Sequence, residues 1–137
     1  MSWVLDASLA LAWVLPDEGS KIADRLRPKL TPSAPCRVPA LWWYEMSNAL
    51  AVAQRNRRIT ATEVTLAATL FAALPIESDE QPSADTIRRL APLSIQHGLS
   101  AYDAAYLELA LRSGLGIATL DTKLAAAAGK AGARVWR

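Results

Sequence analysis

Two aspartates near opposite ends of the chain follow short apolar segments that predict strands. Asp6 comes after residues 3–5, and Asp121 comes after residues 116–120. In open parallel sheets, ligand sites form beyond the carboxyl ends of the strands, so both carboxylates are placed where a site would form. The alternative interpretation is that each aspartate is the N-cap of the following helix, which is a common role for this residue.

Glu45 lies within a predicted helix and shares its face with mostly apolar side chains. At about 100° per residue, its neighbours on that face are Leu41, Trp42, Asn48, Ala49 and Val52. Because burying an unpaired carboxylate is costly, Glu45 needs a cation, a proton or an arginine beside it. A buried ion pair is therefore the alternative to a metal site at this position.

Asp103 repeats this pattern on another predicted helix. Its face carries the side chains of Leu99, Tyr106, Leu107 and Ala110. Glu108 and Arg112, on the opposite face, are spaced as an i,i+4 ion pair, which predicts that Asp103 points inward. The alternative is a capping box formed by Ser100 and Asp103.

Together, the four acids predict a divalent-metal site. Clustered carboxylates repel one another, and a low-dielectric cleft makes that repulsion expensive. Oxygen ligands favour Mg²⁺ or Mn²⁺ over zinc, and one histidine, His97, with one cysteine, Cys36, cannot build a zinc site. The hydroxyls of Ser8 and Thr119, each two residues from an aspartate, are predicted to orient a carboxylate or a bound water. Ordinary cap or strand roles remain open for both.

Length and composition predict one globular domain over residues 1–137. Hydrophobic residues make up 52% of the chain and charged residues 20%, which excludes a disordered protein. No apolar run reaches the roughly 18 residues of a membrane span, and the start lacks a signal-peptide pattern. We therefore expect a cytoplasmic protein. The net charge of +2 does not by itself indicate nucleic-acid binding, and the high apolar fraction hints at a protein partner.

Proline, glycine and capping signals divide the chain into alternating strands and helices. The predicted strands are residues 3–5, 36–38, 75–77, 116–120 and 133–136. The predicted helices are residues 7–15, 20–26, 39–56, 60–73, 83–97, 100–113 and 122–128. This alternation predicts an α/β domain with a parallel sheet.

Four segments carry the acids in a characteristic order. They are VLDASLA (residues 4–10), PALWWYEMSNAL (39–50), LSAYDAAY (99–106) and ATLDTKL (118–124). In order, spacing and chain length, they resemble a PIN-domain ribonuclease of the VapC toxin type. The resemblance spans nearly the whole chain, and the set of four segments is more specific than any one of them.

The resemblance implies a three-layer α/β/α fold around a central, mainly parallel sheet. It implies a Mg²⁺ site made by Asp6, Glu45, Asp103 and Asp121, and endonucleolytic cleavage of RNA. It also implies a homodimer, inhibited by a small VapB-type antitoxin. Asn48 matches a position where members of the family often carry a polar side chain. From the site itself we expect a metal-activated water as nucleophile, with Asp103 or Asp6 accepting its proton.

Three alternative functions fit less well. A phosphatase with an aspartyl nucleophile usually carries a second aspartate two residues later, where this chain has Ser8. A receiver-type phospho-acceptor domain needs paired acids early and a lysine at a strand end, whereas Asp6 stands alone and Lys123 follows its predicted strand. A PIN-like scaffold that binds RNA or protein without cutting is the non-enzymatic alternative, and the presence of all four acids argues against it.

Overall fold

The computed structural model describes residues 2–137. Its strands are β1 (Trp3–Leu5), β2 (Cys36–Val38), β3 (Ile76–Ser78) and β4 (Gly116–Ala118). Its α-helices are α1 (Ala7–Leu11), α2 (Lys21–Leu26), α3 (Leu41–Arg55), α4 (Ala61–Ala73), α5 (Ala84–His97), α6 (Ala101–Ser113) and α7 (Thr122–Lys130). A 3₁₀ turn, Arg27–Lys29, follows α2.

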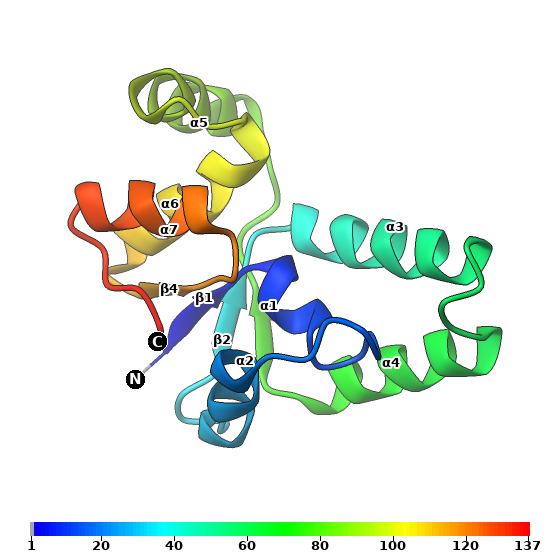
Figure 1. The fold of residues 1–137 in the computed structure, drawn as a ribbon. Helices are drawn as coiled ribbons and strands as arrows, with labels where there is room; N and C mark the ends of the chain where they lie inside the picture. The colour runs from blue at the N-terminus through cyan, green and yellow to red at the C-terminus, as the bar shows by residue number, and fades with distance from the viewer. Residues whose placement is uncertain (1) are drawn as a thin grey trace.

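The four strands form one parallel sheet in the order β3-β2-β1-β4. Figure 1 shows α6 and α7 on one side of the sheet and α1, α3 and α4 on the other. The predicted three-layer α/β/α fold is therefore confirmed. Because the strands are parallel, their carboxyl ends share one edge, and the segments that begin at Asp6, Pro39, Asp79 and Thr119 all leave the sheet there.

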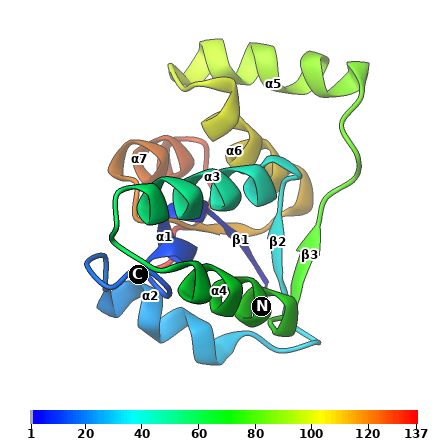
Figure 2. The same cartoon turned by 90° about the vertical axis from the view of Figure 1, so that its right-hand side faces the viewer.

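The core contains two large, fully buried rings, Trp42 of α3 and Tyr106 of α6. Trp42 packs edge-on against Phe71 of α4, with ring centroids 5.4 Å apart, and α3 and α4 run side by side in Figure 2. At the start of β4, a Cβ on Gly116 would lie 2.3 Å from a ring carbon of Trp3. The absence of a side chain at Gly116 therefore leaves room for the Trp3 ring of β1 to pack against the backbone of β4.

The capping and glycine signals that divide the sequence are formed in the structure at α4, α5 and α6. Thr60 and Glu63 form a complete capping box at the start of α4, and the Ser100 hydroxyl accepts a hydrogen bond from Asp103 N–H at the start of α6. Gly98 and Gly114 end α5 and α6 with positive φ angles of 63° and 67°, a conformation that costs glycine little.

Two predicted boundaries are wrong. Helix α1 ends at Leu11, not near residue 15, because the chain forms a turn ahead of Pro16. The predicted last strand, residues 133–136, is not formed: Val135 makes an isolated parallel bridge to Ile117, whose N–H donates to Arg134 O and whose carbonyl accepts from Trp136 N–H. A single bridge does not extend into a strand.

Strand β4 is also shorter than predicted, and this affects the acid-bearing loop. It ends at Ala118, two residues before the expected end. Beyond it, Leu120 N–H donates to the Ser8 hydroxyl and Asp121 N–H donates to the Thr119 hydroxyl. Side-chain acceptors therefore replace the sheet ladder in the segment that leads to Asp121.

Helix α5 stands away from the sheet and packs on α6, as Figure 2 shows. None of its side chains is fully buried, and Ile87 and Ile95 are largely exposed. Within residues 2–137, no helix combines the length and apolarity that crossing a bilayer requires.

Candidate active site

A cavity of about 350 Å³ lies at the carboxyl edge of the sheet. All four acids singled out in the sequence line it, and each comes from a different segment of the chain. The lining residues are Asp6, Ala7, Ser8, Leu11, Glu45, Asn48, Ala49, Asp103 and Asp121. The fold thus brings together four carboxylates that are spread over more than a hundred residues of sequence.

Asp6 is the most buried of the four, with 6% of its surface exposed. Its Oδ2 accepts hydrogen bonds from Ser8 Oγ and Thr119 Oγ1, both at 2.6 Å. Asp6 occupies the N-cap position of α1, as the alternative interpretation predicted, but its side chain makes no capping hydrogen bond to the helix. Burial raises the pKa of Asp6, and the nearby charge of Asp121 raises it further, while the two hydroxyls oppose the shift.

The two hydroxyls also connect the start of α1 to the loop after β4. Ser8 Oγ lies 3.2 Å from Thr119 Oγ1 and accepts from Leu120 N–H at 3.0 Å. Thr119 Oγ1 accepts from Asp121 N–H at 2.9 Å. The same pair of side chains therefore orients the Asp6 carboxylate and fixes the backbone that carries Asp121.

Asp121 is the N-cap of α7, as the alternative interpretation predicted. Its Oδ1 accepts hydrogen bonds from Lys123 N–H at 2.9 Å and Leu124 N–H at 3.2 Å. Its Oδ2 receives no hydrogen bond from residues 2–137. Capping therefore uses one oxygen and leaves the other available at the cavity, so the two roles of Asp121 are compatible.

Glu45 lies at the margin of the buried face of α3. The fully buried side chains of this helix are Trp42, Met46, Leu50 and Ala53. The prediction that Glu45 lies on the apolar face is therefore wrong by part of a turn: its predicted neighbours Leu41, Ala49 and Val52 are only half-buried. The helix packs on the sheet through the adjacent row of side chains, because that row carries the large Trp42 ring together with Met46 and Leu50. Asn48, one turn on, is exposed at the cavity rim.

One hydrogen bond holds the Glu45 side chain. Tyr106 of α6 donates its hydroxyl proton to Glu45 Oε1 at 2.5 Å. The buried ion pair considered as an alternative is not formed by any residue that the structure describes. Burial raises the pKa of Glu45; the charges of Asp6 and Asp103 add to the rise, and the Tyr106 hydroxyl opposes it.

Asp103 faces inward as predicted, and its apolar neighbours on α6 are all buried. The capping box is only half formed: the Ser100 hydroxyl accepts from Asp103 N–H at 3.1 Å, and α6 lacks the reciprocal bond that α4 and α5 have. Burial raises the pKa of Asp103, followed by the charges of Asp121 and Asp6, with Lys123 acting in the opposite direction. The carboxylate therefore belongs to the same charged group as the other three.

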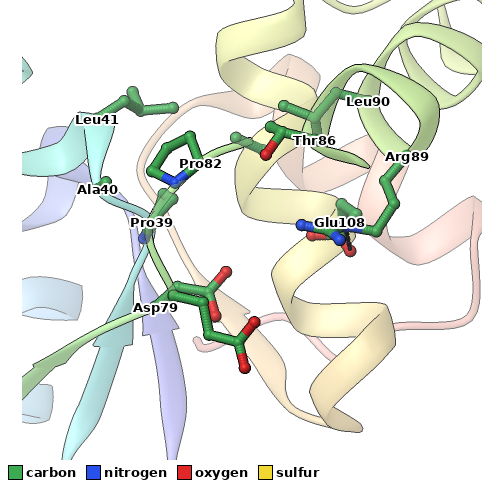
Figure 3. A pocket seen from close by; sticks show the side chains of 11 residues that line it. Pro39, Ala40, Leu41, Asp79, Pro82, Thr86, Arg89, Leu90 and Glu108 are labelled. Carbon is green, nitrogen blue, oxygen red and sulfur yellow. Dashed lines mark ion pairs between the residues drawn. The ribbon is translucent and has the colours of Figure 1, made fainter. Parts of the chain in front are cut away.

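A second acidic cluster in the protein is neutralised by arginines, which makes an informative contrast. It borders a smaller cavity of about 80 Å³, enclosed by the start of α3, the β3–α5 loop, α5 and α6. Figure 3 shows Arg89 of α5 beside Glu108 of α6, with Asp79 at the floor of this cavity. Arg89 Nε lies 3.0 Å from Glu108 Oε1, and Arg112 Nη2 lies 2.5 Å from Asp79 Oδ2.

These ion pairs change the charge balance of the second cluster. Burial acts to raise the pKa of Asp79, yet Arg112 and Arg37 outweigh it and the net shift is downward. The predicted pair of Glu108 and Arg112 is confirmed at 2.7 Å. Its face is not open to solvent, however, because α5 covers Glu108 down to 12% side-chain exposure.

No such compensation exists at the four-acid cavity. Within the described residues, no arginine or lysine forms an ion pair with Asp6, Glu45, Asp103 or Asp121. Over the same residues, no three His, Cys, Asp or Glu side chains converge closely enough to enclose a metal ion unaided. The cavity is thus an open, uncompensated acidic site with oxygen donors only.

Tyr106 is the polar residue at this site that the sequence did not single out. In the sequence Tyr106 falls among the apolar neighbours of Asp103, and its position one helix turn after that acid is the local signal for it. Its hydroxyl partner lies 61 positions away, which no local pattern reveals.

Comparison with known proteins identifies the family of this chain. A model of the PIN-domain family matches residues 3–130. Ribonuclease VapC3 of Pyrobaculum aerophilum is 30% identical over 129 residues, which cover 91% of this chain and 93% of the relative. The chain therefore belongs to the PIN-domain family, and its similarity to VapC3 places it among the VapC-type members, as the resemblance predicted.

Solved structures show the same fold. The crystal structure of PAE2754 from Pyrobaculum aerophilum matches with a TM-score of 0.70 and 24% identity, covering 98% of this chain and 83% of that chain. That of VapC20 from Mycobacterium tuberculosis, described as a sarcin-ricin loop cleaving toxin, matches with a TM-score of 0.65 and 20% identity, covering 93% and 95%.

Proposed function

We propose that this chain is a divalent-metal-dependent endoribonuclease that acts as the toxin of a VapBC-type pair in the cytoplasm. The observation that carries the proposal is the set of four carboxylates on one cavity, none of which forms an ion pair within the described residues. Burial and the neighbouring carboxylates raise the pKa values of Asp6, Glu45 and Asp103. The match to ribonuclease VapC3 supports RNA as the substrate class.

The donor chemistry of the cavity fits Mg²⁺, with Mn²⁺ as a substitute. Mg²⁺ binds oxygen ligands and usually keeps several waters, so one or two carboxylates and substrate phosphates suffice to hold it. This agrees with an open site in which the side chains line the cavity without enclosing an ion. We propose that Asp6, Glu45, Asp103 and Asp121 hold the ion, directly or through water.

A bound divalent ion would supply Lewis-acid activation of water and offset charge on the phosphate. Ser8 and Thr119 hold the Asp6 carboxylate through Oδ2, and neither hydroxyl bonds to Oδ1. Asp103 lines the same cavity and forms no ion pair within the described residues, and we assign it the proton of the attacking water. Hydrolysis by water leaves the RNA 2′-hydroxyl unused, so the products should carry 5′-phosphate ends.

We expect the purified protein to cut single-stranded or structured RNA in the presence of Mg²⁺. In excess chelator the cleavage rate should fall by at least about 100-fold, because the metal supplies most of the activation of water. Activity should return on adding Mg²⁺ or Mn²⁺. Mapping the RNA ends gives the second measurement. Equal cleavage in chelator would contradict the metal role, and cleavage confined to duplex DNA would contradict the RNA assignment.

We further propose a small antitoxin protein as the natural partner, and a homodimer as the assembly. Exposed apolar side chains support both proposals. Val14, Leu66 and Leu70 line an open cavity of about 240 Å³ beside α4, and Ile87 and Ile95 leave one side of α5 uncovered. An antitoxin arginine that reaches the acidic cavity would make charge-assisted hydrogen bonds there.

We expect expression of this chain alone to slow growth of a bacterial host, and co-expression with the protein encoded beside it to restore growth. The reason is that an occupied acidic cavity cannot bind RNA phosphate. Growth curves, with copurification of the two proteins, make the measurement. The toxin role would be contradicted if the host grew normally while it expressed this chain alone, and the protein purified from those cells still cleaved RNA.

A further inference from the structure

Different interactions hold the four carboxylates at the cavity in place. Asp6 is fixed by two hydroxyls, and Asp121 by two backbone N–H groups. Asp103 is a short side chain on the first turn of α6. Glu45 has the longest side chain of the four, and within the described residues one hydrogen bond, from Tyr106, holds its carboxylate. The orientation of this carboxylate therefore depends on a single hydrogen bond.

Tyr106 is well suited to hold that carboxylate. Its ring is fully buried among the core residues of α6, so the ring has little freedom to move. Its hydroxyl reaches from α6, on one side of the sheet, to Glu45 of α3, on the other. A hydrogen bond to an ionised acceptor is stronger and more directional than a neutral one.

The placement of Tyr106 also links two of the acids. Tyr106 lies three residues after Asp103 on α6. One turn of a rigid helix therefore joins Asp103 to the residue whose hydroxyl donates a hydrogen bond to Glu45. Tyr106 therefore connects the carboxylate of Glu45 on α3 to the helix turn that carries Asp103 on α6. A metal site needs its ligands held at a defined separation, and outer-sphere hydrogen bonds commonly provide this.

We propose that Tyr106 is a positioning residue, which holds the Glu45 carboxylate toward the cavity and thereby sets the affinity of the four-acid site for a divalent cation. This inference rests on the metal site of the proposed function. A plainer role, in which Tyr106 only fills the core and Glu45 only satisfies its hydroxyl, makes different predictions.

The test is calorimetric titration of Mg²⁺ or Mn²⁺ alone into the metal-free full chain. Tyr106→Phe keeps the ring and removes the donor, and we expect it to weaken metal binding by at least about tenfold. Tyr44→Phe is the matched control, because Tyr44 precedes Glu45 but is 78% exposed; its affinity should equal that of the wild type. Thermal melts establish that both variants are folded at the titration temperature.

A double-mutant cycle separates positioning from core filling. Glu45→Gln should weaken binding on its own, and adding Tyr106→Phe to it should cost less than about a further twofold, since the carboxylate that Tyr106 positions is already absent. In RNA cleavage, Tyr106→Phe should need more Mg²⁺ for half-maximal rate and should approach the wild-type rate at saturating Mg²⁺. A defect in the core would not be rescued by metal.

The outcomes distinguish this inference from the proposed function. Metal binding by the wild type, with Tyr106→Phe within about twofold of it, would overturn the inference and leave the metal site intact. Additive losses in the double variant would also overturn it. No metal binding by the wild type would contradict the metal site of the proposed function and this inference with it.

Discussion

Replacing Asp103 with asparagine is expected to abolish RNA cleavage and, at the same time, to raise the melting temperature of the metal-free protein. Asparagine keeps the shape of the side chain but removes its charge and its ability to accept a proton. General-base catalysis contributes about 10²–10⁴-fold to such reactions, so the rate should fall by at least about 100-fold.

The gain in stability has a separate cause. Asp103 is partly buried beside the charges of Asp121 and Asp6, and both burial and repulsion raise its pKa. A carboxyl whose pKa is higher in the folded state than in the unfolded state destabilises the fold at neutral pH. Removing this charge should therefore raise the melting temperature in chelator by a few degrees, while Mg²⁺ should stabilise the variant less than the wild type.

Asp24→Asn is the matched control, because it makes the same change at an exposed acid of α2, away from the cavity. Cleavage and the response to Mg²⁺ should be unchanged there. If the main role of Asp103 were to cap α6, asparagine would serve nearly as well, and Asp103→Asn would keep both its activity and its response to Mg²⁺. Full activity in Asp103→Asn would contradict the site assignment.

The second large effect is a reversal of the pH dependence of stability by Mg²⁺. The pKa values of Asp6, Glu45 and Asp103 are all raised in the folded protein, first by burial. Between the unfolded and the folded pKa of each group, the folded state binds more protons, so stability falls as pH rises. In chelator, these three groups should make the protein more stable near pH 5 than near pH 7.5.

Mg²⁺ should act in the opposite direction, because its ligands must be deprotonated. At about 100 times its dissociation constant, a ligand stabilises the fold by about 2.7 kcal/mol, which for a domain of this size corresponds to roughly 10 °C in melting temperature. This gain should be present near pH 7.5 and largely lost near pH 5. Thermal melts across this range, with chelator or with Mg²⁺, make the measurement.

Other carboxylates contribute to the pH dependence of stability with the opposite sign, and the experiment must separate their contribution from that of the cavity acids. Arginines lower the pKa values of Asp79 and Asp17, so their stabilisation is lost as pH falls through these lowered values. The comparison is therefore between the wild type and Asp6→Asn, in which one raised group is removed and these pairs are intact. Identical pH profiles for the two proteins in chelator would contradict the proposed repulsion at the cavity.

Much of the secondary structure could be predicted because its signals are local. The capping box of Thr60 and Glu63, the Ser100 cap and the glycines after α5 and α6 act within about four residues along the chain. The parallel sheet followed from the alternation of strands and helices. The four acids could be selected because two follow predicted strands and two interrupt apolar helix faces.

The sequence by itself thus determined most of the helices and strands, the order of the acids and the strand ends near which they gather, but not the ends of α1 and β4 or the fate of residues 133–136. Only the tertiary structure decided how each acid is held. The contacts of Tyr106 with Glu45 and of Ser8 with Thr119 join residues 61 and 111 positions apart. Asp79 is neutralised by Arg37 of β2 and Arg112 of α6, and Glu108 pairs with Arg89 of α5 in addition to its i,i+4 partner on α6. Hydrogen bonds and charge act through space, so which carboxylates are compensated and which are left unpaired follows from the packing of helices around the sheet.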